Sequence, residues 1–180
     1  MSNNFENADD FIMDDLKPKK SKVNGKKKGN RVELELSKLL TSRFGKGFSR
    51  SVGSGNRWGQ KVQLSEQAKQ VYSGDLVVPE GFKFTIESKG GYDGIDINSV
   101  FVRGNSELDS FMDQALADSR RSGRKPMLCW KRTRKPWLAF LLTTDLQGCE
   151  FKYSIKYGKW TGIALEHLLK LEDSFFMLQK

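Results

Sequence analysis

The most informative stretch of the chain runs from residue 74 to residue 89 and reads GDLVVPEGFKFTIESK. Apolar residues follow Asp75, Pro79-Glu80-Gly81 breaks the run, and alternating apolar and polar residues then lead to Glu87 and Lys89. This pattern predicts two strands joined by a short turn. We expect the strands to pair as a hairpin that brings Asp75 close to the Glu87 end of the second strand.

The charged residues of this stretch are suited to phosphodiester hydrolysis. Glu87 and Lys89 are two residues apart on a strand, so their side chains point to the same face. The carboxylates of Asp75 and Glu87 can converge on a hard cation such as Mg²⁺, which prefers carboxylate, carbonyl and water oxygens. The lysine beside them can orient the attacking water or stabilise charge that develops on a phosphate.

These residues also resemble a known signature. Asp75, eleven further residues and Glu87-Ser88-Lys89 look like the PD-(D/E)XK nuclease motif, with Gly74 where that family often has proline. Upstream, Lys28-Gly29, with Glu33 four residues after the glycine, resembles the first helix of archaeal-type Holliday junction resolvases. The segment RSVGSG at 50–55 resembles the strand and loop that follow that helix in those resolvases.

The resemblance implies an α/β restriction-endonuclease-like fold, cleavage of branched DNA that depends on Mg²⁺ (with Mn²⁺ as a substitute), and a homodimer. The catalytic residues that it implies are Glu33, Ser54, Asp75, Glu87 and Lys89. The implied metal ligands are Glu33, Asp75, Glu87 and the backbone carbonyl of Ser88. Three choices stay open: Glu35 is an alternative to Glu33, Ser51 is an alternative to Ser54, and Gln114 faces either the site or solvent.

The charge balance indicates a nucleic-acid partner. The chain has 31 Lys and Arg against 22 Asp and Glu, a formal net charge of +9, and a pI near 9.5. A basic protein of this kind suits a polyanion, of which nucleic acid is the commonest. The residues expected to contact DNA are Lys28, Arg50, Arg120, Arg121, Arg124, Lys131, Arg132 and Arg134. The segment 55–73, which is longer than those resolvases usually have, puts the choice of DNA substrate in doubt.

The 180 residues suffice for one domain. Residues 1–28 carry an acidic block and then a basic block with few apolar residues, so we expect a disordered charged tail before a nuclease domain at 29–180. The domain is predicted to be a mixed β-sheet flanked by helices. Predicted helices cover 32–44, 107–121 and 163–171, with a short one at 65–71. Predicted strands cover 48–52, 74–78, 82–87, 127–131, 137–143 and 150–157.

Several classes of protein are excluded at this level. No apolar run approaches the ~18 residues of a membrane span, and the N-terminus lacks the features of a signal peptide. Two cysteines are too few for a disulfide framework or a zinc site, which indicates a reducing cytoplasm. We expect it to be that of a prokaryotic cell or of a virus-infected host. Exposed apolar residues at 101–103 and around Trp130 and Trp137 are either a dimer surface or core.

Two alternatives to junction cleavage remain. One is a PD-(D/E)XK nuclease that acts on flaps, ends or specific sites, and the other is a catalytically inactive nucleic-acid-binding protein. The joint presence of Glu33, Asp75, Glu87 and Lys89 favours an enzyme.

Overall fold

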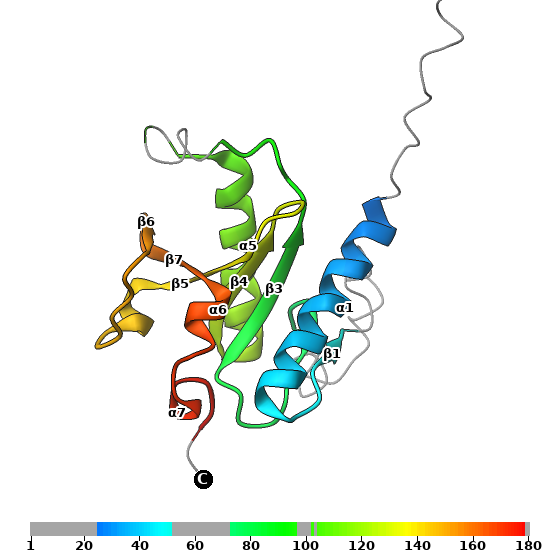
Figure 1. Ribbon diagram of the computed structural model, residues 1–180, viewed down its shortest axis with the longest axis vertical. Helices are drawn as coiled ribbons and strands as arrows, with labels where there is room; N and C mark the ends of the chain where they lie inside the picture. The colour runs from blue at the N-terminus through cyan, green and yellow to red at the C-terminus, as the bar shows by residue number, and fades with distance from the viewer. Residues whose placement is uncertain (1–24, 52–72, 97–101, 103, 179–180) are drawn as a thin grey trace, which may run out of the picture.

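The computed structural model describes residues 25–51, 73–96, 102 and 104–178. These residues form a five-stranded mixed sheet with helices on both faces (Figure 1). The strand order is β3-β4-β5-β7-β6, and a separate two-stranded sheet pairs β1 with β2. The predicted α/β fold with a mixed sheet is confirmed. In the described part of the chain, no helix has the length and apolar character needed to cross a membrane.

The helices are α1 (Gly25–Phe44), α5 (Ser106–Ser122), α6 (Leu165–Leu168), α7 (Asp173–Phe176) and the 3-10 helix η1 (Thr143–Leu146). The strands are β1 (Ser49–Arg50), β2 (Leu76–Val77), β3 (Phe84–Gly90), β4 (Lys125–Lys131), β5 (Trp137–Leu142), β6 (Ile155–Tyr157) and β7 (Trp160–Ala164). The first two long predicted helices are confirmed, although α1 begins at Gly25. The strands predicted at 127–131 and 137–143 are also confirmed as β4 and β5, which pair antiparallel.

The long helix α5 connects β3 to β4, which pair parallel. Its start is capped by Asn105, whose side-chain oxygen accepts a hydrogen bond from the backbone N–H of Leu108 at 3.0 Å. Its end is closed by Gly123 in the left-handed conformation, at φ 70°. A helical crossover of this kind is what a parallel strand pair requires, and here it lays α5 along β3.

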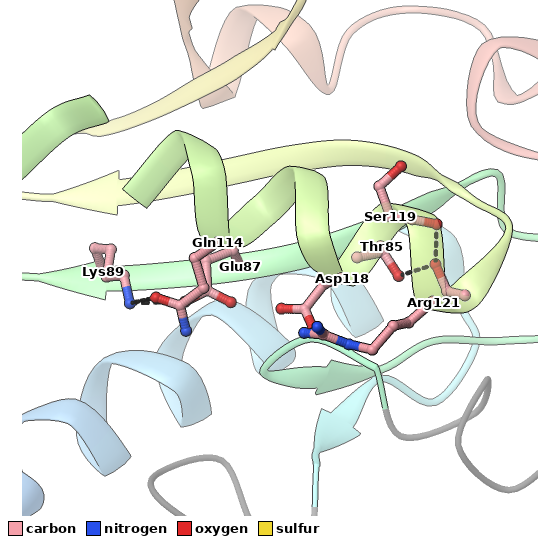
Figure 2. A network of polar contacts seen from close by, with 8 residues as sticks. Thr85, Glu87, Lys89, Gln114, Asp118, Ser119 and Arg121 are labelled. Carbon is pink, nitrogen blue, oxygen red and sulfur yellow. Dashed lines mark hydrogen bonds and ion pairs between the residues drawn. The ribbon is translucent and has the colours of Figure 1, made fainter. Parts of the chain in front are cut away.

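Two apolar cores lie on the two faces of the sheet and fix which side chains of β3 face which helix. Phe84 and Ile86 pack in the core that α1 covers, together with Leu36 and Leu40 of that helix. The other core contains Phe111 and further apolar residues of α5. Because side chains alternate along a strand, Thr85, Glu87 and Lys89 face α5. These three side chains therefore lie between the sheet and α5 (Figure 2).

The predicted hairpin of 74–78 with 82–87 is wrong. β2 pairs antiparallel with β1, through Ser49 opposite Val77 and Arg50 opposite Leu76. β3 pairs with β4 instead. The turn at 79–81 is present, and the N–H of Asp75 bonds to the Ile86 carbonyl on the edge of β3 opposite β4, but the residues of β2 form their ladder with β1.

The predicted closing helix at 163–171 is also wrong over its first residues. Residues 160–164 form β7, and the helix that follows is the single turn α6. Gly162 suits the strand because a Cβ there would lie 2.5 Å from Cε1 of Phe140. The predicted edge strand at 150–157 is reduced to β6, which pairs with β7.

The tryptophans of the β4–β5 hairpin belong to the core. Trp130 is 1% exposed and Trp137 is 7% exposed, so neither contributes an exposed apolar patch. Of the other expected surface, at 101–103, only Val102 is described, and it is 84% exposed. The predicted short helix at 65–71 lies outside the described residues.

Candidate active site

Asp75 lies at the free edge of β3, just before β2. Its backbone N–H donates to the carbonyl of Ile86 at 2.9 Å, and its Oδ2 accepts from the backbone N–H of Ser88 at 2.8 Å. On its other side, the Asp75 carbonyl accepts from the N–H of Ser51 at 2.8 Å. Gly74 fits this close approach, because a Cβ there would lie 2.7 Å from the Ile86 carbonyl oxygen. Asp75 therefore lies beside Glu87, as the sequence predicted, although the hairpin expected to bring them together does not form.

Glu87 and Lys89 form an ion pair on the face of β3 that α5 covers. Lys89 Nζ lies 2.7 Å from Glu87 Oε1, and the Glu87 side chain is 1% exposed. The second oxygen, Oε2, is buried and has no hydrogen-bond partner among the described residues. A buried carboxylate oxygen without a donor is costly. The part of the chain that the structure describes thus leaves one oxygen of Glu87 without a donor.

The charge states of the three residues reflect this crowding. Burial raises the pKa of Asp75 to about 6, and the nearby charge of Glu33 adds to the rise, while the Ser88 N–H opposes it. Burial, and then the charge of Asp75, raise the pKa of Glu87 well above its usual range. Burial acts to lower the pKa of Lys89, but the Glu87 carboxylate outweighs it, so the pKa is raised and the lysine stays charged.

Helix α5 faces β3 with a row of three polar side chains spaced four residues apart: Gln114, Asp118 and Ser122. Figure 2 shows the first two of them beside Glu87 and Lys89. Gln114 Oε1 accepts from Lys89 Nζ at 2.7 Å. At the other end of the row, Thr85 Oγ1 donates to Ser122 Oγ at 2.8 Å. The open choice for Gln114 is thereby resolved, since its side chain faces the site and holds the lysine.

Asp118 is the middle member of this row and was not anticipated from the sequence. It is 3% exposed, its charge contributes to the raised pKa values of both Asp75 and Glu87, and it pairs with Arg121 (Figure 2). A signal existed: Asp118 follows Phe111 by seven residues and Ala115 by three, which is the spacing of a buried helical face. A buried acid on that face needs a hydrogen-bonding or oppositely charged partner.

On α1, the two candidate glutamates point to different places. Glu33 is 9% exposed, and its Oε2 lies 2.7 Å from Arg50 Nε. Arg50 also donates to Asn30 Oδ1 at 2.7 Å. Glu35 instead pairs with Lys131 and accepts from Trp137 Nε1 at 3.3 Å. Of the two, Glu33 is the one whose charge acts on Asp75.

The donor set suits a small hard cation. No three His, Cys, Asp or Glu side chains of the described residues are grouped so that they could hold a metal ion. Mg²⁺, however, is usually bound by only one or two carboxylates, with water and substrate phosphates completing its shell. Asp75 and Glu87 are the two carboxylates available for such a site, and no described residue donates to the buried Glu87 Oε2.

The expected DNA-contacting residues fall into separate groups. One group lies where α5 ends and β4 begins: Arg120, Arg121 and Arg124. A second lies at the other end of β4: Lys131, Arg132 and Arg134. Seven residues of strand, ~20 Å, separate the groups. Arg50 is paired with Glu33, while Ser54 and the side chain of Lys28 lie outside the described residues.

Comparison with known proteins identifies the family. Residues 24–171 match the family described as "Phage putative PDDEXK endonuclease". Protein D14 of Escherichia phage T5 is 28% identical over 127 residues, which cover 68% of this chain and 74% of that protein. Among solved structures, Hjc, a Holliday junction resolvase from the archaeal hyperthermophile Archaeoglobus fulgidus, matches 81% of this chain and 99% of its own, at 19% identity and a TM-score of 0.39.

Proposed function

Since this chain belongs to the PDDEXK phage endonuclease family, we propose that it is a Mg²⁺-dependent endonuclease that hydrolyses phosphodiester bonds in branched DNA. The observation that carries the proposal is the pair of carboxylates formed by half-buried Asp75 and buried Glu87, beside the charged Lys89. Two free cysteines and a phage-type family fit work in the reducing cytoplasm of a prokaryotic or virus-infected cell.

In this proposal Asp75, Glu87 and the carbonyl of Ser88 hold the cation, and Glu33 joins them from α1. Mn²⁺ is a substitute of similar preference for oxygen ligands. When bound, the cation supplies Lewis-acid polarisation of the phosphate and a lower pKa for its water. The orphaned Glu87 oxygen and the two raised carboxylate pKa values support this assignment, because a nearby cation favours both ionised forms.

Lys89 is the cation that would meet the scissile phosphate. Its side chain is 16% exposed, so most of it is held by protein while its ammonium group keeps access to the surface. The Glu87 carboxylate and the Gln114 amide oxygen both contact Nζ and fix its position. A positive group fixed in advance stabilises charge developing on the phosphate without reorganising during the reaction. Ser54 remains a candidate for assisting the attack on the phosphate.

Branched DNA is the finer part of the proposal, and it implies a homodimer. A four-way junction presents two equivalent strands, and one active site per chain cuts both only if two chains are related by a two-fold axis. The support is the order of the motifs from Lys28 to Lys89 and the two basic groups on either side of the site. Two separated groups suit DNA arms that leave the cleavage site in different directions.

The test compares cleavage of a four-way junction, a flap and a linear duplex by one preparation, with Mg²⁺ and with EDTA. We expect cleavage of the junction with Mg²⁺, paired nicks placed symmetrically about the crossover, and a mass by light scattering of about twice 20.5 kDa. Preference for the flap or the duplex, with single nicks by a monomer, would replace junction cleavage with the flap or site-specific alternative. DNA binding without cleavage of any substrate would contradict the enzyme assignment.

A further inference from the structure

A pocket with mostly basic walls lies beyond the end of β3, away from the carboxylate pair. Its volume is about 320 Å³, and its polar walls are Arg31 of α1, Glu35 of α1, and Lys131, Arg132, Thr133 and Arg134 at the β4–β5 turn. We call this the basic pocket. Four cations and one acid line it, so an anion is the ligand that its charge favours.

The wall formed by the β4–β5 turn is held rigidly. Asp93, in the loop after β3, accepts from the N–H of Thr133 at 2.7 Å and from its hydroxyl at 2.6 Å. Arg132 Nη2 donates to the Asp93 carbonyl at 2.8 Å. The N–H of Gly91 donates to the Lys131 carbonyl at 2.8 Å. The turn is thus fixed to the loop that follows the catalytic strand before any ligand arrives.

The cations of the basic pocket are only partly neutralised. Lys131 pairs with Glu35. Arg31 and Arg134 are exposed and form no ion pair with a described residue. Arg132 Nε is buried, and none of the described residues accepts a hydrogen bond from it. Among the described residues, a buried donor of the pocket thus lacks an acceptor and two of its arginines lack an ion-pair partner, which indicates an oxyanion as the missing partner.

Arg134 also has a backbone conformation that its side chain disfavours. Its φ is +57°, and it is the third residue of a turn closed by a hydrogen bond from Lys135 N–H to the Arg132 carbonyl at 3.2 Å. A positive φ at the third position of a turn favours glycine or asparagine. Arginine at this position is strained, and such strain concentrates at functional sites. The folding of the turn does not explain an arginine there, whereas contact with a ligand does.

We infer that the basic pocket binds backbone phosphates of the DNA arm that leaves the active site past the end of β3, with Arg31, Arg132 and Arg134 as the contacting residues. This inference rests on the proposed DNA substrate. Gly91 of the pocket follows Lys89 by two residues, ~7 Å of strand, which brings the pocket within reach of the same duplex. Contacts of this kind set affinity and position without reading sequence.

The test measures junction-DNA affinity in EDTA across a salt series for wild type, Arg134→Gly, and Arg134→Gly with Arg31→Gln. Each arginine removed should weaken binding severalfold at low salt and flatten the slope of log K against log salt by about 0.9. Arg134→Gly should melt at the wild-type temperature or higher, because glycine relieves the strained φ. Lys156→Gln on β6, at the far edge of the sheet, removes the same charge and should leave affinity and slope unchanged.

Two results would overturn the inference. One is an unchanged affinity and slope in the folded variants. The other is selective displacement of DNA from wild type by inorganic phosphate at matched ionic strength, which would make the pocket a site for free anions. The proposed activity fails separately: if no substrate is cleaved but the slope still flattens in Arg134→Gly, the pocket stands and the nuclease proposal falls.

Discussion

At the scale of single residues, the central feature is a carboxylate that the described residues leave without a full set of hydrogen-bond partners. Glu87 is 1% exposed and lies near Asp75, and its pKa is raised well above the usual range even with Lys89 at 2.7 Å. The rise means that burial and the neighbouring acids outweigh the lysine. Without a cation, the ionised form of Glu87 therefore lowers the stability of the fold.

Replacing that charge should stabilise the metal-free protein. In EDTA at neutral pH, we expect Glu87→Gln to raise the unfolding free energy, because the raised pKa of Glu87 means that burial of its charge costs more than the Lys89 ion pair returns. Adding Mg²⁺ should raise the melting temperature of wild type and not that of the variant, because a ligand stabilises only the fold that binds it. Thermal unfolding measures both, with exposed Glu150→Gln as the control. A less stable Glu87→Gln protein would show that the Lys89 ion pair dominates.

The sequence predicted this part of the site well and its surroundings less well. Asp75, Glu87 and Lys89 converge as expected, because a strand fixes the direction of alternate side chains and the Asp75 hydrogen bonds fix the register. Asp118 was missed, because only the packing of α5 on β3 brings it near the carboxylates. The roles of Glu33 and Ser54 stay predictions.

At the scale of elements, the site depends on the close approach of α1 to β3. Gly90 allows this approach: a Cβ there would lie 2.4 Å from Cγ2 and 3.0 Å from Cβ of Val32, the neighbour of Glu33. The local sequence predicted both elements, but not their separation. The predicted hairpin and the predicted closing helix were wrong for a related reason. The partner of β2 is β1, which lies outside the predicted hairpin. The strand at Gly162 depends on its fit against Phe140, which is distant in the sequence.

Gly90→Ala should therefore push α1 away from β3 and displace Glu33. We expect a loss of about 1–3 kcal/mol of stability, typical of an overpacked core, and slower cleavage. Val32→Ala in the same chain should restore part of the stability, which a double-mutant cycle by chemical denaturation measures. The control is Gly47→Ala, where a Cβ meets no atom within 4 Å. Additive effects of Val32→Ala and Gly90→Ala would mean that this contact does not set the spacing.

At the scale of the whole molecule, the charges are distributed around the site rather than gathered into one patch. The chain carries a net charge of +9, yet Arg120, Arg121 and Arg124 lie at one end of β4, and the basic pocket lies at the other. In the sequence, the basic residues from 120 to 134 follow one another closely. Only the structure shows that the seven-residue strand β4 separates them into two groups. Asp75 and Glu87 lie at β3, the strand that pairs with β4, and therefore between two surfaces suited to phosphate.

The most direct test of the account is single-turnover cleavage of a four-way junction with Mg²⁺ by wild type, Asp75→Asn and Glu87→Gln, with DNA binding measured on the same samples. Both variants should lose cleavage by at least ~100-fold, because each removes one of the carboxylates proposed to hold the metal. Both should bind the junction as tightly as wild type or more tightly, because a negative charge near the phosphates is gone. Cleavage at the wild-type rate by either folded variant would contradict the assignment of the active site.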